Sequence, residues 1–201
     1  MSKIRRTIVC ILSLLIFALP LRASDGGSHR YWLDDIGQFV PTLAMPALSL
    51  CGVKPKHSWR ERIAVTVTSM ALCEGVTYTL KHTIHSTRPD GSDRHSFPSG
   101  HSARAFRGAE IIREEYGWGW GAGAYAVAAG VGALRIHHHR HRFGDVAGGA
   151  VIGFLTARAA YLLLPHERKL FGWDKSEVTA FASPVVDLGN RQFGAQMTII
   201  F

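Results

Sequence analysis

The sequence is short of cysteine, and this shortage narrows the chemistry it can carry. It contains 3 cysteines in 201 residues, and Cys10 lies in the amino-terminal apolar leader. Neither Cys51 nor Cys73 has the neighbouring residues that activate a catalytic thiolate, so a thiol enzyme is not expected. These two cysteines can form a disulfide only in an oxidising compartment; otherwise they are small buried apolar residues on helices.

Acidic residues are also few, with 15 against 23 lysines and arginines and a formal net charge of +8. Four of the basic residues belong to the leader, which leaves 19 basic against 15 acidic residues in the remainder. Such a modest excess suits an anionic substrate or a membrane surface. The sequence has no basic-aromatic stripe and no signature of a nucleic-acid-binding fold, so no nucleic-acid partner is expected. It also has no internal repeat.

Residues 1–23 have the pattern of an export signal. Basic KIRR precedes the apolar run TIVCILSLLIFALPL, and Leu21-Arg22-Ala23 leads into polar SDGG. A basic start, a short apolar run and a small residue at the end are typical of a signal peptide. Because Leu-x-Ala is an imperfect cleavage site, an uncleaved membrane anchor is the alternative. In both cases the rest of the chain is expected outside the cytoplasm.

Residues 24–170 are expected to form one helical domain. The composition is 47% hydrophobic, but the mean hydropathy of +0.07 is low for a protein made entirely of lipid-facing helices. The stretch 63–80 has the length of a membrane span, although Glu74 and the threonines need a side that faces protein. The predicted helices cover 31–53 (one broken helix or two short ones, because of Pro41 and Pro46), about Ser58 to Thr87, Ser99 to about Tyr116, 121–134, and about Asp145 to Leu164.

Residues 171–201 are expected to form a separate tail. The segments 177–187 and 191–201 flank a turn-like LGN and read as two strands of a β-hairpin. Such a hairpin could be a small edge sheet, a membrane contact or a poorly ordered tail. The predicted fold class is therefore all-α with a short C-terminal β-hairpin or tail.

Three short blocks carry residues suited to phosphate chemistry, and the first is KHTIHSTRP (81–89). Lys81 and Arg88 are seven residues apart, so on a continuous helix they would share one face. His85 would lie on roughly the same face. The two cations could then hold different phosphate oxygens, with Arg88 offering bidentate geometry. Taken alone, the block is also typical of a solvated basic helix end.

The second block is PSGH (98–101), in which Ser99 is a good helix N-cap. A Ser-Gly turn that opens a helix directs free N–H groups and a hydroxyl toward an anion. Gly100 would let a phosphate approach the backbone closely. His101, one turn inside, could donate a proton to a leaving oxygen. An ordinary capped helix with a surface histidine is the alternative for this block alone.

The third block is RIHHHRHRFGD (135–145). Arg135 supplies a further phosphate ligand. His141 and Asp145 are four residues apart, so the carboxylate can reach one imidazole nitrogen if the turn is helical. The other nitrogen would then be free to attack phosphorus. Because phosphoryl transfer chiefly needs positioning and charge stabilisation, the cations and backbone donors could replace a metal. No metal or cofactor is therefore predicted.

In this order the three blocks resemble the type 2 phosphatidic acid phosphatase superfamily, which includes bacterial nonspecific acid phosphatases and vanadium haloperoxidases. Its pattern is K-x6-R-P, then P-S-G-H, then S-R-x5-H-x3-D, and the resemblance covers about residues 62–165. It implies a compact helical bundle of the phosphatidic acid phosphatase/haloperoxidase type. Leu134 stands where the family has serine, which removes a hydroxyl at the edge of the site.

The resemblance also implies a role for each matching residue. His141 would be the nucleophile that forms a phosphohistidine, Asp145 its partner and His101 the general acid. The phosphate-binding residues would be Lys81, Arg88, Ser99, Gly100 and Arg135.

Three other interpretations compete with a metal-free phosphatase. His137, His141 and Asp145 could hold zinc if the chain stayed helical from 137 to 145, although Arg140 and Arg142 would repel a cation. The same pocket with vanadate bound would suit a haloperoxidase. A non-enzymatic envelope scaffold is the third possibility, and the complete charged set argues against it.

The sequence thus predicts an exported, membrane-associated phosphatase of a bacterial-type cell envelope, with its site facing the periplasm. It would hydrolyse a phosphomonoester or pyrophosphate, preferably of an envelope lipid, through a phosphohistidine. Phosphatidic acid, phosphatidylglycerol phosphate, polyprenyl pyrophosphate and the phosphates of lipid A are candidates. A nonspecific soluble periplasmic acid phosphatase is the alternative. The sequence does not predict an oligomeric state.

Overall fold

The computed structural model describes residues 32–173, 179–187 and 192–200. The chain divides into two compact units, Met1–Leu162 and Leu163–Phe201. The predicted export signal at 1–23 lies outside the described residues. The predicted domain boundary between residues 170 and 171 stays a prediction.

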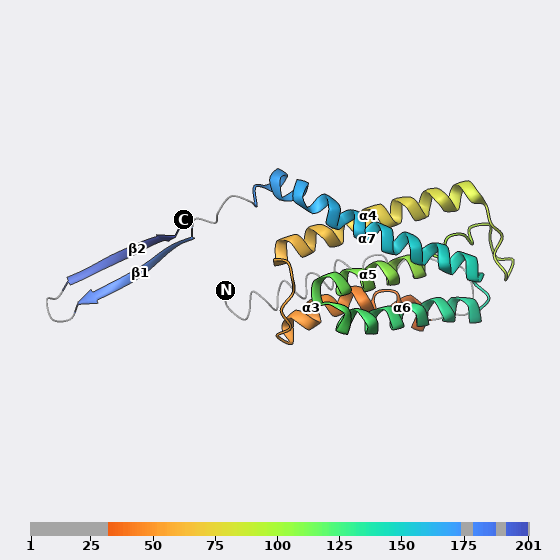
Figure 1. The fold of residues 1–201 in the computed structure, drawn as a ribbon, viewed down its shortest axis with the longest axis horizontal. Coiled ribbons are helices and arrows are strands. Elements are labelled where there is room, and N and C mark those ends of the chain that lie inside the picture. Colours follow the sequence, from red (N-terminus) through yellow and green to blue (C-terminus); the bar gives the residue numbers. More distant parts are fainter. Residues whose placement is uncertain (1–31, 174–178, 188–191, 201) are drawn as a thin grey trace. The chain divides into compact units, whose positions relative to one another are not determined.

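Six helices make up the described α-helical part of the chain, and the prediction of a helical bundle is confirmed (Figure 1). The first predicted segment forms two short helices. Pro41 lies in the first turn of the second one, where the missing N–H has no helical partner to lose. The helices are α2 (Trp32–Gly37), α3 (Val40–Leu50), α4 (Trp59–Ile84), α5 (Gly100–Tyr116), α6 (Trp118–His137) and α7 (Phe143–Phe171).

Helix α5 is the central helix of the first unit, where it packs against α3, α4 and α6. Ala105 and Ala109 of α5 form a buried cluster with Ala128 and Val131 of α6. Small side chains let the two helices approach closely and fill the space without voids. Since so much of α5 is buried, its charged side chains lie inside the unit and need partners there.

Glycines bring α7 into direct contact with α5. A Cβ on Gly149 would collide with the carbonyl oxygen of Ser99, and a Cβ on Gly153 would collide with that of Ala103. Only glycine permits such close approach of two helix backbones. The contact continues at the start of α7, where the Ser99 N–H donates to the Asp145 carbonyl over 2.9 Å. The first turns of α5 and α7 are therefore fixed to each other.

Several predicted helix ends were wrong. Helix α6 runs from Trp118 to His137, three residues longer at each end than the predicted 121–134. Helix α4 ends at Ile84 instead of about Thr87, because His85 takes the left-handed conformation (φ 49°, ψ 40°) and caps it. Helix α7 continues past the predicted end at Leu164 and stops at Phe171. Pro165 lies inside it, although an interior proline removes one helical hydrogen bond.

The second unit contains two strands. β1 (Thr179–Asp187) and β2 (Gln192–Ile200) pair in antiparallel fashion, with Thr179 opposite Ile200 and Asp187 opposite Gln192. These strands lie within the two segments that the sequence predicted as a hairpin, and the LGN turn between them lies outside the described residues.

Among the described residues, α4 and α7 are the helices long and apolar enough to cross a membrane. Core helices of soluble proteins can meet the same length and composition test. The exposed large apolar residues Val151, Leu155 and Leu162 of α7 recur at helical spacing and so lie on one face. Cys51 is exposed and Cys73 is buried, and both are free thiols, so the possible disulfide is not formed.

Candidate active site

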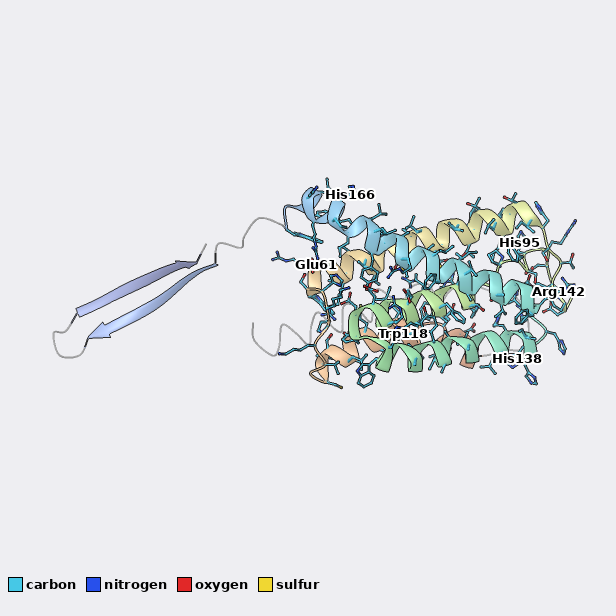
Figure 2. The ribbon with its side chains drawn as sticks, viewed as in Figure 1. Glu61, His95, Trp118, His138, Arg142 and His166 are labelled. Atoms are coloured by element: carbon cyan, nitrogen blue, oxygen red, sulfur yellow. The ribbon has the colours of Figure 1, made fainter. Side chains whose placement is uncertain are left out.

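The three sequence blocks meet at one end of the helices of the first unit. Lys81 lies in the last turn of α4, and Arg135 lies in the last turn of α6. His101 lies in the first turn of α5, and Asp145 lies in the first turn of α7. The turn that carries His141 joins α6 to α7. Figure 2 marks this end of the unit with His95, His138 and Arg142.

Lys81 and Arg88 do not share a helix face, so this prediction was wrong. Helix α4 ends at Ile84, and Arg88 lies in the following loop, where it is 8% exposed. Its Nε donates to Asp93 Oδ1 over 2.8 Å, while Lys81 Nζ donates to the His95 carbonyl over 2.6 Å. His85, which the same argument placed on that face, is the left-handed cap of α4.

Arg88 keeps one donor available. Its Nη1 is buried and has no hydrogen-bond partner among the described residues. A buried unsatisfied donor is costly, and a bound anion would satisfy it. Arg88 therefore remains suited to phosphate binding, although the loop and not a helix positions it.

The two predicted catalytic histidines lie among cations, with His141 buried and His101 partly buried. His141 is 3% exposed. Arg135, the cation with the largest effect on both histidines, is 4% exposed. Burial, then Arg135 and Arg88, hold the pKa of His141 far below its usual value, at about 2. Burial, then Arg135 and Arg104, hold the pKa of His101 well below its usual value. In the absence of an anion both imidazoles are therefore neutral at pH 7, and a neutral imidazole is the form that can attack phosphorus.

Asp145 lies near His141 but does not hydrogen-bond to it. The Nδ1 of His141 is 3.8 Å from Asp145 Oδ2 and, among the described residues, it has no hydrogen-bond partner. Asp145 Oδ2 instead accepts from Ser96 Oγ over 2.5 Å and from the Arg142 N–H over 2.8 Å. His141 precedes the start of α7 at Phe143, so the helical geometry assumed for this pair is absent. Catalytic hydrogen bonds are often long before a substrate binds.

Ser99 is the N-cap of α5, as predicted. It is completely buried, and its Oγ accepts from the N–H of Ser102 over 3.4 Å. The first N–H groups of a helix have no partner within that helix, and in α5 these belong to Gly100 and His101. A Cβ on Gly100 would meet only Thr77 at 3.8 Å and Arg104 at 4.0 Å. Packing alone therefore does not require glycine there, and phosphate binding by Ser99 and Gly100 stays a prediction.

Sequence reasoning missed three residues that contact the site. Ser96 bonds to Asp145. Arg104 lowers the pKa of His101 and makes two hydrogen bonds to Glu74, over 2.6 and 2.7 Å. Its position three residues after His101, on the same helix face, was an available signal. Asp35 of α2 lies 3.0 Å from Nε2 of His101, 66 residues away in sequence, and no sequence pattern pointed to it.

The zinc alternative lacks its required geometry. Helix α6 ends at His137 and α7 begins at Phe143, so the chain is not helical from 137 to 145. His137, His141 and Asp145 therefore do not share one helix face. Within the described ranges, no three or more histidine, cysteine, aspartate or glutamate side chains are grouped so that they could hold a metal ion.

Comparisons with known proteins agree with the fold and the blocks. A family model described as the PAP2 superfamily matches residues 90–169. A Lipid A 1-phosphatase from Porphyromonas gingivalis is 35% identical over 98 residues, which are 48% of this chain and 22% of that protein. The chain thus spans about a fifth of the length of this curated relative.

A solved structure shares the fold. The crystal structure of Aquifex aeolicus LpxE matches with a TM-score of 0.51 and 21% identity, over 74% of this chain and 94% of that chain. The family model covers the second and third blocks, which include both histidines, while Lys81 and Arg88 precede it. Residues 90–169 are thus similar to the PAP2 superfamily, the same superfamily that the three sequence blocks resemble.

Proposed function

We propose that this protein is a metal-independent phosphatase that hydrolyses a phosphomonoester or pyrophosphate of an envelope lipid through a phosphohistidine. The observation that carries the proposal is the grouping of His141 and His101 with Lys81, Arg88 and Arg135, cations that lower the pKa of both imidazoles. Cations around a water-excluded site stabilise the charge that develops on a transferring phosphoryl group.

The chemistry needs two steps. In the first, a ring nitrogen of His141 forms a bond to phosphorus, and the bond from phosphorus to the leaving oxygen breaks. His101 gives that oxygen a proton as it departs. In the second, water attacks the phosphohistidine, His101 takes the water's proton, and phosphate leaves with His141 restored. An incoming phosphate carries negative charge, which favours the protonated form of His101 that the first step requires.

Asp145 would act after a small movement. Its carboxylate lies 3.8 Å from His141 Nδ1, so a shift of under ~1 Å would form a hydrogen bond of ordinary length. That bond would fix the tautomer of His141 and stabilise the positive ring that forms during attack.

A lipid substrate is favoured by the outer surfaces of two helices. Ile63 and Val67 of α4 are exposed, as are Val151, Leu155 and Leu162 of α7. Exposed apolar residues at this density are typical of a surface that meets a membrane or another protein. The Porphyromonas gingivalis relative is named for lipid A, so a lipid A 1-phosphate is the first substrate to test. The predicted export signal supports a site on the periplasmic side.

The test is phosphate release from full-length protein in detergent, with EDTA present. The panel contains lipid A 1-phosphate, phosphatidic acid, a polyprenyl pyrophosphate and a soluble sugar phosphate. We expect the lipids to react faster than the sugar phosphate. Loss of activity in EDTA would contradict the metal-free mechanism, and a preference for the soluble ester would favour the nonspecific acid phosphatase.

The nucleophile needs its own control. His141→Ala should lower the rate about 10³-fold or more, while His166→Ala, a change at an exposed histidine of α7, should leave it unchanged. Rapid quenching of a reaction with phosphate-labelled substrate should trap label on the wild-type protein in alkali but not in acid, as expected for a phosphorus–nitrogen bond. Equal turnover by His141→Ala would exclude the assignment.

A further inference from the structure

A carboxylate from a distant helix contacts the imidazole of His101. Asp35 Oδ1 lies 3.0 Å from Nε2 of His101, and the two side chains are 47% and 18% exposed. We propose that Asp35 is a positioning residue for the general acid: its carboxylate accepts the Nε2 proton of His101, so that Nδ1 carries the proton transferred to and from the reacting oxygens. The inference rests on the proposed phosphatase function.

The hydrogen bond decides which nitrogen of His101 can act. A carboxylate only accepts, so Nε2 must carry a proton when the two groups are bonded. Protonated His101 then holds its second proton on Nδ1. Transfer of that proton to the leaving oxygen returns the ring to the neutral form that is protonated on Nε2, still bonded to Asp35. In the second step Nδ1 accepts a proton from water, and no proton has to move through Asp35.

Charge gives Asp35 a second effect on the same ring. Cations that lower the pKa of His101 come from four segments: Lys81 of α4, Arg88 of the loop that follows it, Arg104 of α5 and Arg135 of α6. His141 and Asp145 are further titratable groups of the site. Asp35 is the carboxylate that bonds to the ring, and a nearby negative charge favours the imidazolium. Since Asp35 is half-exposed, water screens this effect. The larger contribution is the fixed tautomer of the ring, which an asparagine would not enforce because its amide can donate as well as accept.

Helix α2 is held in place independently of this bond. Gln38, just after α2, is 5% exposed and accepts from Arg104 Nη1 over 3.0 Å. A Cβ on Gly37 would lie 3.0 Å from Val131 of α6, so the backbone of α2 already packs tightly there. Removal of the Asp35 charge should therefore leave α2 docked, which makes the role of Asp35 separable from folding.

The leaving group provides a test that a merely structural role would not pass. A general acid matters for an alcohol, which leaves poorly as an anion, and matters little for a nitrophenol, which leaves well without a proton. The substrates are phosphate esters of a long-chain alcohol and of a nitrophenol with the same alkyl chain. For Asp35→Asn we expect kcat/KM to fall about 10- to 100-fold with the alkyl ester and under about 3-fold with the nitrophenyl ester.

The pH profile gives a second measurement. Loss of the carboxylate should lower the pKa of His101 in the enzyme–substrate complex. The alkaline limb of kcat for the alkyl ester should then move to lower pH in Asp35→Asn. Asp35→Glu, which keeps the charge, should restore part of the alkyl-ester rate.

The matched control is Gln38→Leu, which breaks the other polar contact between this segment and α5. It should change both esters by the same factor, and the thermal unfolding midpoint of each variant reports any loss of fold. Equal loss on both esters in Asp35→Asn, or an unchanged pH profile, would overturn the inference. If the wild-type protein releases no phosphate from either ester, or if His141→Ala remains active, the proposed function itself fails.

Discussion

The two ends of α5 differ in the sign of their buried charges and in how those charges are paired. At its start, His101 and Arg104 lie among cations, and the nearby Arg88 has a buried donor with no partner in the described part of the chain. At its other end, Glu115 is 3% exposed and completely bonded: it accepts from the His57 N–H over 3.0 Å and from Tyr161 Oη over 2.7 Å.

The neighbouring carboxylates at this second end are neutralised as well. Glu110 accepts from Arg113 over 2.6 and 2.7 Å and from Tyr125 Oη over 2.6 Å. Glu114 pairs with Lys56 over 2.7 Å, with Arg113 over 2.8 Å and with Arg158 over 3.0 Å. The hydrogen bond and charge of Lys56 lower the pKa of Glu114.

The start of α5 thus has the properties of a binding site, and its other end has those of a structural network. The amino-terminal end of a helix dipole is positive and favours anions, whereas its carboxyl-terminal end disfavours them. The glutamates at the second end therefore need cations and hydroxyl groups to be stable when buried. At the first end Arg104 pairs with Glu74 and Arg88 pairs with Asp93, but a buried donor of Arg88 has no partner among the described residues. That end is therefore suited to receive an anion from outside.

The largest expected effect tests the charge at the first end. Arg135→Gln should lower kcat/KM about 10³-fold, because it removes a buried cation from the transferring phosphoryl group. Arg158→Gln at the second end should change kcat/KM by less than about 3-fold. Steady-state phosphate release with one lipid substrate measures both, and a similar loss in the two variants would show that the ends do not differ in function.

For stability we expect the reverse: a substitution at the second end of α5 should lower the free energy of unfolding more than it lowers activity. Glu115→Ala leaves His57 and Tyr161 without their buried partner and should lower the free energy of unfolding by about 3 kcal/mol. The molecules that remain folded should keep a nearly normal kcat. Chemical denaturation in detergent and kcat of the purified folded fraction provide the measurements, and a large loss of kcat without a loss of stability would contradict this division.

The contact between α5 and α7 should show a somewhat smaller effect. Gly153→Ala places a methyl group against the Ala103 carbonyl and should cost about 2 kcal/mol in unfolding free energy. Gly130→Ala on α6 is the matched change, since nothing lies within 4 Å of its new Cβ, and alanine should be neutral or slightly stabilising there. Thermal unfolding of both variants compares them; equal midpoints would mean that α5 and α7 are not closely packed.

The smallest effect concerns pH. The folded-state pKa values of His141 and His101 are depressed, so between those values and about 6.5 the unfolded chain binds more protons. The contribution of the two neutral histidines to the free energy of unfolding is therefore fully present above about pH 6.5. As the pH decreases from there, the free energy of unfolding decreases by about 1.4 kcal/mol per pH unit for each histidine. His141→Asn should reduce this slope by about half, as measured by urea denaturation at pH 5.5 and 7.5. A slope that is unchanged in His141→Asn would mean that His141 is not buried in its neutral form.

Local structure near the second block was predictable because its signals act over a few residues. Ser99 is the N-cap, and α5 runs from Gly100 to Tyr116, close to the predicted range. The same kind of signal gave a wrong result for the first block. There Pro89 was the basis for predicting that the helix continues to about Thr87. His85 ends α4 earlier, and a left-handed histidine cap leaves little trace in sequence.

The sequence by itself determined the chemical groups of this protein: the cations, the two histidines, the carboxylate and the helices that carry most of them. Their spacing also pointed to phosphate chemistry, because residue type and periodicity are local properties. Only the tertiary structure decided which groups bond. It directs Asp145 to Ser96 and brings Asp35 to His101 across 66 residues of chain. Such pairings depend on how helices pack around α5, and that packing is a sum of many distant contacts that no single stretch of sequence records.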